Sequence, residues 1–150
     1  MRLANMRSEK EGPKQAGDPI IMEKNYTRII LRWLLVLVYC LAVFYFSSSR
    51  PTRMLFNLNQ YDKIVHFVAF LFLGILAYRA IKIPDFEISK TNAVLLTFIF
   101  SVIFGVLIEV NQFFIPYRSA ELVDIVADML GNITGILCYL PFSKGLTKDS

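Results

Sequence analysis

Seven polar side chains that can bind a ligand or transfer a proton lie within or beside strongly apolar segments of this sequence. They are Asp62, His66, Glu109, Gln112, Arg118, Asp124 and Asp128. A charged side chain inside a membrane span is costly, so it usually has a partner there and often has a function. Carboxylates can bind an amine or act as a general base, a guanidinium can hold a phosphate or carboxylate, and an imidazole can transfer protons. These residue types therefore predict a polar site in an apolar protein.

Most of these residues also have a purely structural interpretation, which the sequence leaves open. Asp62 can cap a helix, and His66 can be a hydrogen-bond partner between helices. Glu109 or Asp124 can pair with Arg118 and so hold the connection between two helices. If all seven residues are structural, the protein is a membrane bundle without a ligand.

The elements that must position these residues are four apolar segments. The chain has 150 residues, of which 55% are hydrophobic, and a mean hydropathy of +0.51. About 20 apolar residues in a helix cross the hydrocarbon core of a bilayer. We therefore predict an all-α, polytopic membrane protein whose four transmembrane helices form an antiparallel bundle. The expected helices are at about 29–46, 62–83, 92–110 and 122–140.

Polar segments flank this membrane domain, which we place at residues 29–141. Residues 1–28 have no helical apolar period and predict a disordered tail, and residues 142–150 form a second tail after Pro141, which we expect to end the fourth helix. Of the Lys and Arg residues, 12 lie on the side of the two tails and 4 lie on the other side. This bias predicts that both termini are cytoplasmic.

With this orientation, all seven polar residues fall at the outer end of the bundle. The second and fourth helices begin there and the third helix ends there. At 100° per residue, two helix faces of about 60° carry most of the set. These faces consist of Gly105, Glu109 and Gln112 on the third helix, and of Asp124, Asp128, Gly131 and Gly135 on the fourth. The Gly131-x-x-x-Gly135 pattern, like Gly105, is expected to allow close helix packing.

The sequence does not decide whether the protein is an enzyme. His66 lies one turn after Asp62 and resembles an oriented base, but Ser119 is the only nucleophile candidate on the outer side. Glu109, Asp124, Asp128 and His66 are of types that can bind a metal ion, but their spacing matches no recognised metal motif, so no metal site is assigned and no cofactor is identified. No nucleic-acid-binding motif is present, and a nucleic-acid partner is not expected.

These residues occur in blocks that resemble the VanZ-like family over roughly residues 30–140. The blocks are Asp62-Lys63-x-x-His66-Phe67, Leu73-Gly74, Glu109-x-x-Gln112, Pro116-x-Arg118, Asp124-x-x-x-Asp128 and Gly131-x-x-x-Gly135. Family members often have Asn at the position of Asp128, so this chain departs from the pattern by adding a carboxyl group.

The resemblance implies a multi-pass protein of the bacterial cytoplasmic membrane with a role in the cell envelope. The namesake of the family is associated with resistance to the glycopeptide antibiotic teicoplanin. The implied partners are the lipid bilayer and either a lipid-linked envelope precursor or a glycopeptide-type ligand that the protein binds or modifies. A membrane-embedded hydrolase or transferase acting on a lipid head group is the alternative. The resemblance assigns no catalytic residue, and it leaves the oligomeric state open.

Overall fold

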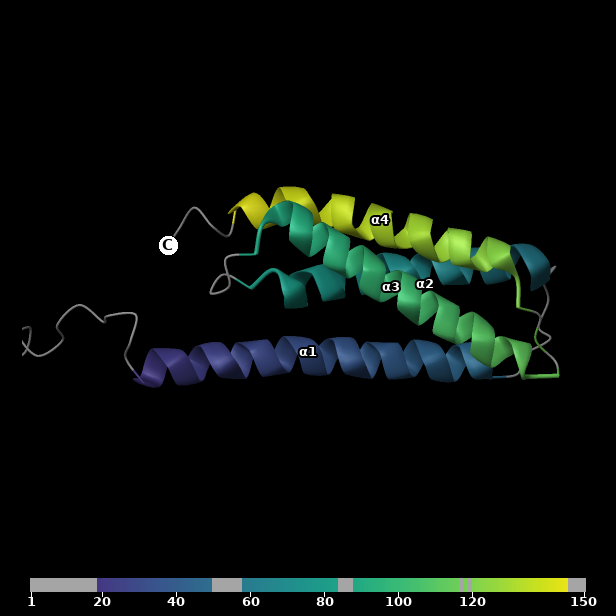
Figure 1. The fold of residues 1–150 in the computed structure, drawn as a ribbon, viewed down its shortest axis with the longest axis horizontal. Helices are drawn as coiled ribbons and strands as arrows, with labels where there is room; N and C mark the ends of the chain where they lie inside the picture. The colour runs from purple at the N-terminus through teal and green to yellow at the C-terminus, as the bar shows by residue number, and fades with distance from the viewer. Residues whose placement is uncertain (1–18, 50–57, 84–87, 117, 119, 146–150) are drawn as a thin grey trace, which may run out of the picture.

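Four long helices make up the computed structural model, which describes residues 19–49, 58–83, 88–116, 118 and 120–145 (Figure 1). The helices are α1 (Pro19–Ser48), α2 (Leu58–Ile81), α3 (Lys90–Phe113) and α4 (Leu122–Gly145), and the described residues contain no strand. Each helix includes a segment long and apolar enough to cross a membrane: Tyr26–Ser48, Asp62–Ile81, Lys90–Phe113 and Leu122–Pro141. The predicted all-α polytopic fold is confirmed.

Two helix ends differ most from the expected boundaries. Helix α1 begins at Pro19, so residues 19–28 are helical rather than disordered, whereas residues 1–18 lie outside the described part of the chain. Proline suits a first helical turn, and extending an existing helix costs far less than starting one. Helix α4 continues through Pro141 to Gly145. The expectation that Pro141 ends the helix was wrong, since a proline removes one internal hydrogen bond and can bend a helix without ending it.

The middle of the chain agrees with expectation more closely. Helix α2 ends at Ile81, before Pro84, which itself lies outside the described residues. Helix α3 begins two residues earlier than predicted because the Ser89 hydroxyl caps it, accepting a hydrogen bond from the Asn92 N–H at 3.1 Å. It also continues to Phe113, which places Gln112 in its last turn.

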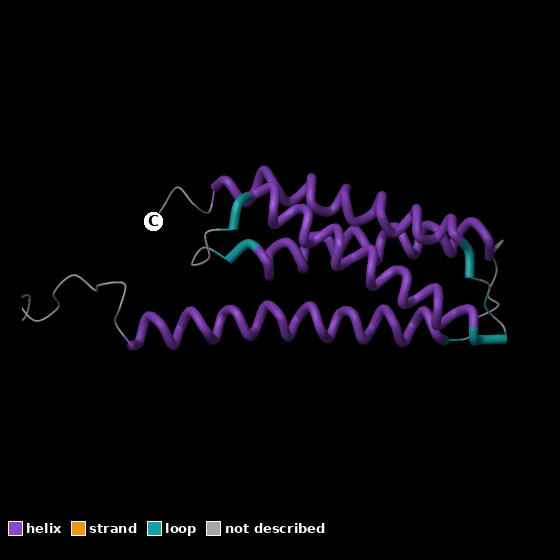
Figure 2. The backbone as a smooth tube through the Cα atoms, in the orientation of Figure 1, coloured by secondary structure: helices purple, strands orange, loops and turns teal. Residues whose placement is uncertain are grey.

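Helices α2, α3 and α4 form the core of the bundle, and α1 lies at its side (Figures 1 and 2). Helices α2 and α4 make the most extensive contact, whereas α1 touches only α2 and α3 among the described residues. Only 6% of the α1 span is buried inside the protein, compared with 39% of the α2 span. Most of the apolar surface of α1 is therefore available to lipid.

Glycines bring α2 and α4 unusually close. A Cβ atom at Gly131 would collide with the backbone carbonyl of Phe67, and one at Gly135 would collide with that of Leu71. From the other side, a Cβ at Gly74 would lie 2.6 Å from the Asn132 carbonyl oxygen. Small residues of this kind allow helix backbones to approach in membranes, and here they fix which faces of α2 and α4 meet.

At one end of the bundle, α1 and α3 end and α2 and α4 begin, so the α1–α2 and α3–α4 connections lie there (Figure 1). We call it the site end. An apolar cluster that includes Val36, Phe70, Leu73 and Ile108 packs α1, α2 and α3 together. Because side chains near the site end are mounted on packed helices, their relative positions are set by the bundle itself.

Candidate functional site

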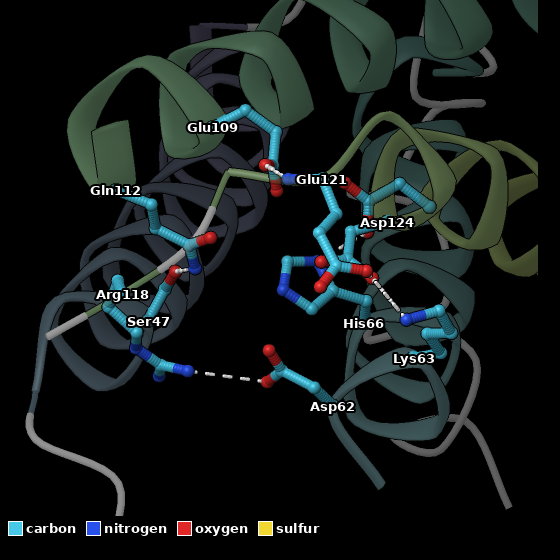
Figure 3. A network of polar contacts seen from close by, with 10 residues as sticks. Ser47, Asp62, Lys63, His66, Glu109, Gln112, Arg118, Glu121 and Asp124 are labelled. Carbon is cyan, nitrogen blue, oxygen red and sulfur yellow. Dashed lines mark hydrogen bonds and ion pairs between the residues drawn. The ribbon is translucent and has the colours of Figure 1, made fainter. Parts of the chain in front are cut away.

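The structure places all seven candidate residues at the site end. Asp62 and His66 lie on α2, Glu109 and Gln112 on α3, and Asp124 on α4, while Arg118 belongs to the α3–α4 connection (Figure 3). Asp128 also lies on α4. Five of them are buried, namely His66, Glu109, Gln112, Asp124 and Asp128. Buried polar groups are costly unless they are paired, so the pairing of each one carries information.

The most buried pair of polar side chains at the site end joins two helices. His66 Nδ1 lies 3.0 Å from Asp128 Oδ1, with the imidazole on α2 and the carboxylate on α4. The other carboxylate oxygen, Asp128 Oδ2, occupies the space that a side chain at position 105 would fill, since a Cβ at Gly105 would lie 2.8 Å from it. An imidazole that shares Nδ1 with a carboxylate has a fixed ring orientation and leaves Nε2 for another partner.

The partner of the histidine is therefore different from the one that the sequence suggested. Asp62 lies one turn before His66, but its Oδ1 accepts a hydrogen bond from Arg118 Nη1 at 3.3 Å instead. Arg118 pairs with neither Glu109 nor Asp124 in the described structure, so the two pairings left open above do not form. Ser119, the suggested nucleophile, lies outside the described residues.

Glu109 has a different partner, which belongs to the backbone. Its Oε2 accepts a hydrogen bond at 2.9 Å from the N–H of Glu121, the residue before α4 (Figure 3). The Glu121 carbonyl in turn accepts from Asp124 N–H at 3.0 Å, in the first turn of α4. Glu109 thus ties the end of α3 to the start of α4 and helps to set where α4 begins.

Three further residues belong to this network although they are not among the seven candidates. Lys63 Nζ lies 2.8 Å from Glu121 Oε2 and 3.9 Å from Asp124 Oδ1. The Ser47 hydroxyl accepts a hydrogen bond from Gln112 Nε2 at 2.6 Å, which joins α1 to α3. The position of Lys63 beside Asp62 was a usable signal, whereas Ser47 and Glu121 flank expected helix ends and carry no distinguishing pattern.

A pocket of about 260 Å³ opens at this network between α1, α2 and α3. Its polar lining consists of Ser47, Asp62, His66 and Arg118, and its apolar lining consists of Val43, Phe46, Val65, Ala69, Phe70 and Ile108. Glu109, Gln112, Asp124 and Asp128 do not line it but contact or lie near residues that do. A pocket lined by both polar and apolar side chains fits an amphiphile better than a wholly polar solute.

Among the described residues of the site end, carboxyl groups outnumber Lys and Arg side chains. Five carboxylates, from Asp62, Glu109, Glu121, Asp124 and Asp128, accompany the cations of Lys63 and Arg118. Ligand atoms of Asp62, His66 and Asp124 all lie within 4.8 Å of one another. This arrangement can attract a cation or an amine, while Arg118 can hold an anionic group at the pocket.

Comparison with known proteins gives a family and a relative in yeast. A family model described as VanZ/LLP1 matches residues 23–143. A protein of Schizosaccharomyces pombe, "Uncharacterized protein C11E3.10", is 30% identical over 116 residues. The aligned region covers 77% of this chain and 65% of the yeast protein, so the chain spans about two thirds of that relative. No solved structure matches the chain.

Proposed function

This chain belongs to the VanZ/LLP1 family of membrane proteins, and from that premise we propose that it binds the polar head group of a membrane amphiphile at the site end. The observation that carries this proposal is the composition of the pocket. Arg118, His66 and Asp62 meet an apolar wall that includes Phe70 and Ile108. An acyl or isoprenoid chain fits the apolar wall, and a phosphate or carboxylate fits the guanidinium of Arg118.

The amphiphile that we favour is a phosphate-bearing lipid or lipid-linked envelope intermediate. We predict that the protein acts through such a ligand in cell-envelope processes or in teicoplanin tolerance. We also predict that it lies in the bacterial cytoplasmic membrane with both termini in the cytoplasm. The yeast relative supports a ligand that bacterial and fungal membranes share, because a fungal cell makes no peptidoglycan for a glycopeptide to bind. A phosphorylated lipid meets that condition.

Lipid retention by purified protein tests the proposal. We expect wild-type protein to keep one class of phosphorylated lipid in native mass spectrometry, and we expect Arg118→Gln to weaken that binding by about 10- to 100-fold. A hydrogen bond to a charged group contributes about 1.5–3 kcal/mol, which corresponds to this change. Arg32→Gln is the matched control, because Arg32 donates to the Arg79 carbonyl at the opposite end of the bundle. Equal lipid retention by both variants would rule out Arg118 as the head-group contact.

A second candidate function, hydrolysis or transfer at the head group, is favoured by one specific feature. The imidazole of His66 lines the pocket and is oriented by the buried Asp128 carboxylate, as expected of a general base. In this case, incubation with lipid extracts should yield a modified lipid, and His66→Gln should abolish product formation while the variant still retains the lipid. Wild-type protein that binds lipid but forms no product would leave binding as the function.

A further inference from the structure

We propose that Asp62, His66 and Asp124 bind a divalent transition-metal ion, such as Mn²⁺ or Zn²⁺, at the edge of the pocket. One ligand atom from each side chain lies within 4.8 Å of the others. Ligand bonds to such ions are about 2.0–2.2 Å long, so two ligands of one ion are separated by at most about 4.4 Å. Small side-chain rotations would bring the three groups onto one ion.

The state of Asp124 points to a cation independently of this clustering. Its side chain is only 2% exposed, and among the described residues its Oδ1 has no hydrogen-bond donor. Lys63 Nζ approaches that atom only to 3.9 Å and forms its shorter contact, 2.8 Å, with Glu121. A buried carboxylate is normally paired or bound to a metal, and this one is directed at Asp62 and His66.

The imidazole is arranged as metal-binding histidines usually are. Its Nδ1 is shared with Asp128 Oδ1 at 3.0 Å, which leaves Nε2 as the ring nitrogen that can bind an ion. Histidine ligands commonly use one nitrogen for the metal and the other for a carboxylate that fixes the ring. Asp128 would therefore be a positioning residue, held outside the ligand set on α4.

The mixed ligand set indicates the class of ion. Carboxylates suit Mg²⁺ and Mn²⁺, and imidazole suits Zn²⁺ and other transition metals, so one nitrogen with two carboxylate groups favours Mn²⁺ or Zn²⁺ over Ca²⁺. Two of the ligands, Asp62 and His66, also line the pocket. An ion held there borders the pocket. Because only three protein groups bind it, coordination positions are left for an oxygen atom of a molecule in the pocket. The view that this oxygen belongs to a phosphate rests on the proposed function, whereas the ion itself does not.

Titration of Mn²⁺ into chelator-treated, full-length protein in detergent tests the ion directly. Electron paramagnetic resonance reports free Mn²⁺, and we expect one site per chain that Zn²⁺ displaces. Asp128→Asn should weaken Mn²⁺ binding by about 10- to 100-fold, as loss of an outer carboxylate typically does. Asp124→Asn and His66→Gln should weaken it more, because each removes a ligand. Glu87→Gln, which removes a carboxylate in the α2–α3 connection, should bind like the wild type.

Each outcome decides the proposal. Stoichiometric binding that is lost in Asp124→Asn supports the site, and Asp62→Asn provides the same test if the first variant does not fold. No stoichiometric binding by the wild type, or undiminished binding by Asp124→Asn, overturns it. Lipid retention by metal-free protein separates the two proposals. Mn²⁺ binding without lipid retention contradicts the head-group function alone, and lipid retention without Mn²⁺ binding contradicts the ion alone.

Discussion

His66→Ala is expected to lower the free energy of unfolding by about 3–5 kcal/mol, the usual cost of leaving a buried charge without its partner. The substitution would leave the Asp128 carboxylate in the α2–α4 interface without its 3.0 Å partner. Asp128 is buried and its second oxygen already lacks a hydrogen bond within the described structure, so no neighbour is in place to compensate. Denaturant titration in mixed micelles would measure the loss.

The double variant provides the control for this expectation. His66→Leu combined with Asp128→Leu should be more stable than His66→Ala, since replacing both members of a buried pair by apolar residues is often neutral. If the double variant loses as much stability as His66→Leu and Asp128→Leu lose separately, added together, the two residues are energetically independent. The buried pair would then not join α2 to α4.

Gly131→Ala is expected to lower the free energy of unfolding by about 3 kcal/mol or more, at the upper end of the usual cost of overpacking. The added methyl group would collide with the backbone carbonyl of Phe67. A backbone atom in a helix cannot rotate away as a side chain can, so α2 and α4 would have to separate. The same separation would pull His66 away from Asp128, and ligand binding should weaken together with stability.

Leu130→Ala is the matched control for the glycine variant. Leu130 is the preceding residue on α4, and its side chain is exposed on the outside of the bundle. Its truncation should change thermal stability in detergent far less than Gly131→Ala does. Equal stability of Gly131→Ala and the wild type would mean that α2 and α4 do not pack as closely as described.

The positions of the helices could be predicted because their cause is local. Four apolar segments of nearly membrane-spanning length exist only as helices in a bilayer, where each backbone group must be satisfied within its own segment. The ends were harder to predict, since Pro19 begins a helix and Pro141 lies inside one. At both places the helix continues into polar sequence, where hydropathy no longer reports secondary structure.

The shared depth of the seven polar residues also followed from the sequence, because alternating spans bring their ends to one side. Their partners did not follow. Pairing depends on how each helix is rotated about its axis, and this is set by the contacts of Gly131 and Gly135 with α2. That rotation gives His66 the distant Asp128 rather than the neighbouring Asp62. The partner of Glu109 is a backbone N–H, a donor that no sequence pattern identifies.

The central claim is that a membrane amphiphile places its head group at the site end, and photocrosslinking tests this most directly. A phospholipid with a diazirine on the first carbons of its acyl chain would be added to purified protein. The sample would be irradiated, and the adducts would be mapped by mass spectrometry. Adducts at the pocket wall, on Val65, Ala69 or Ile108, that excess unlabelled lipid suppresses are the predicted result. Adducts spread only over the lipid-exposed face of α1, as at Leu35 and Leu41, would contradict the account.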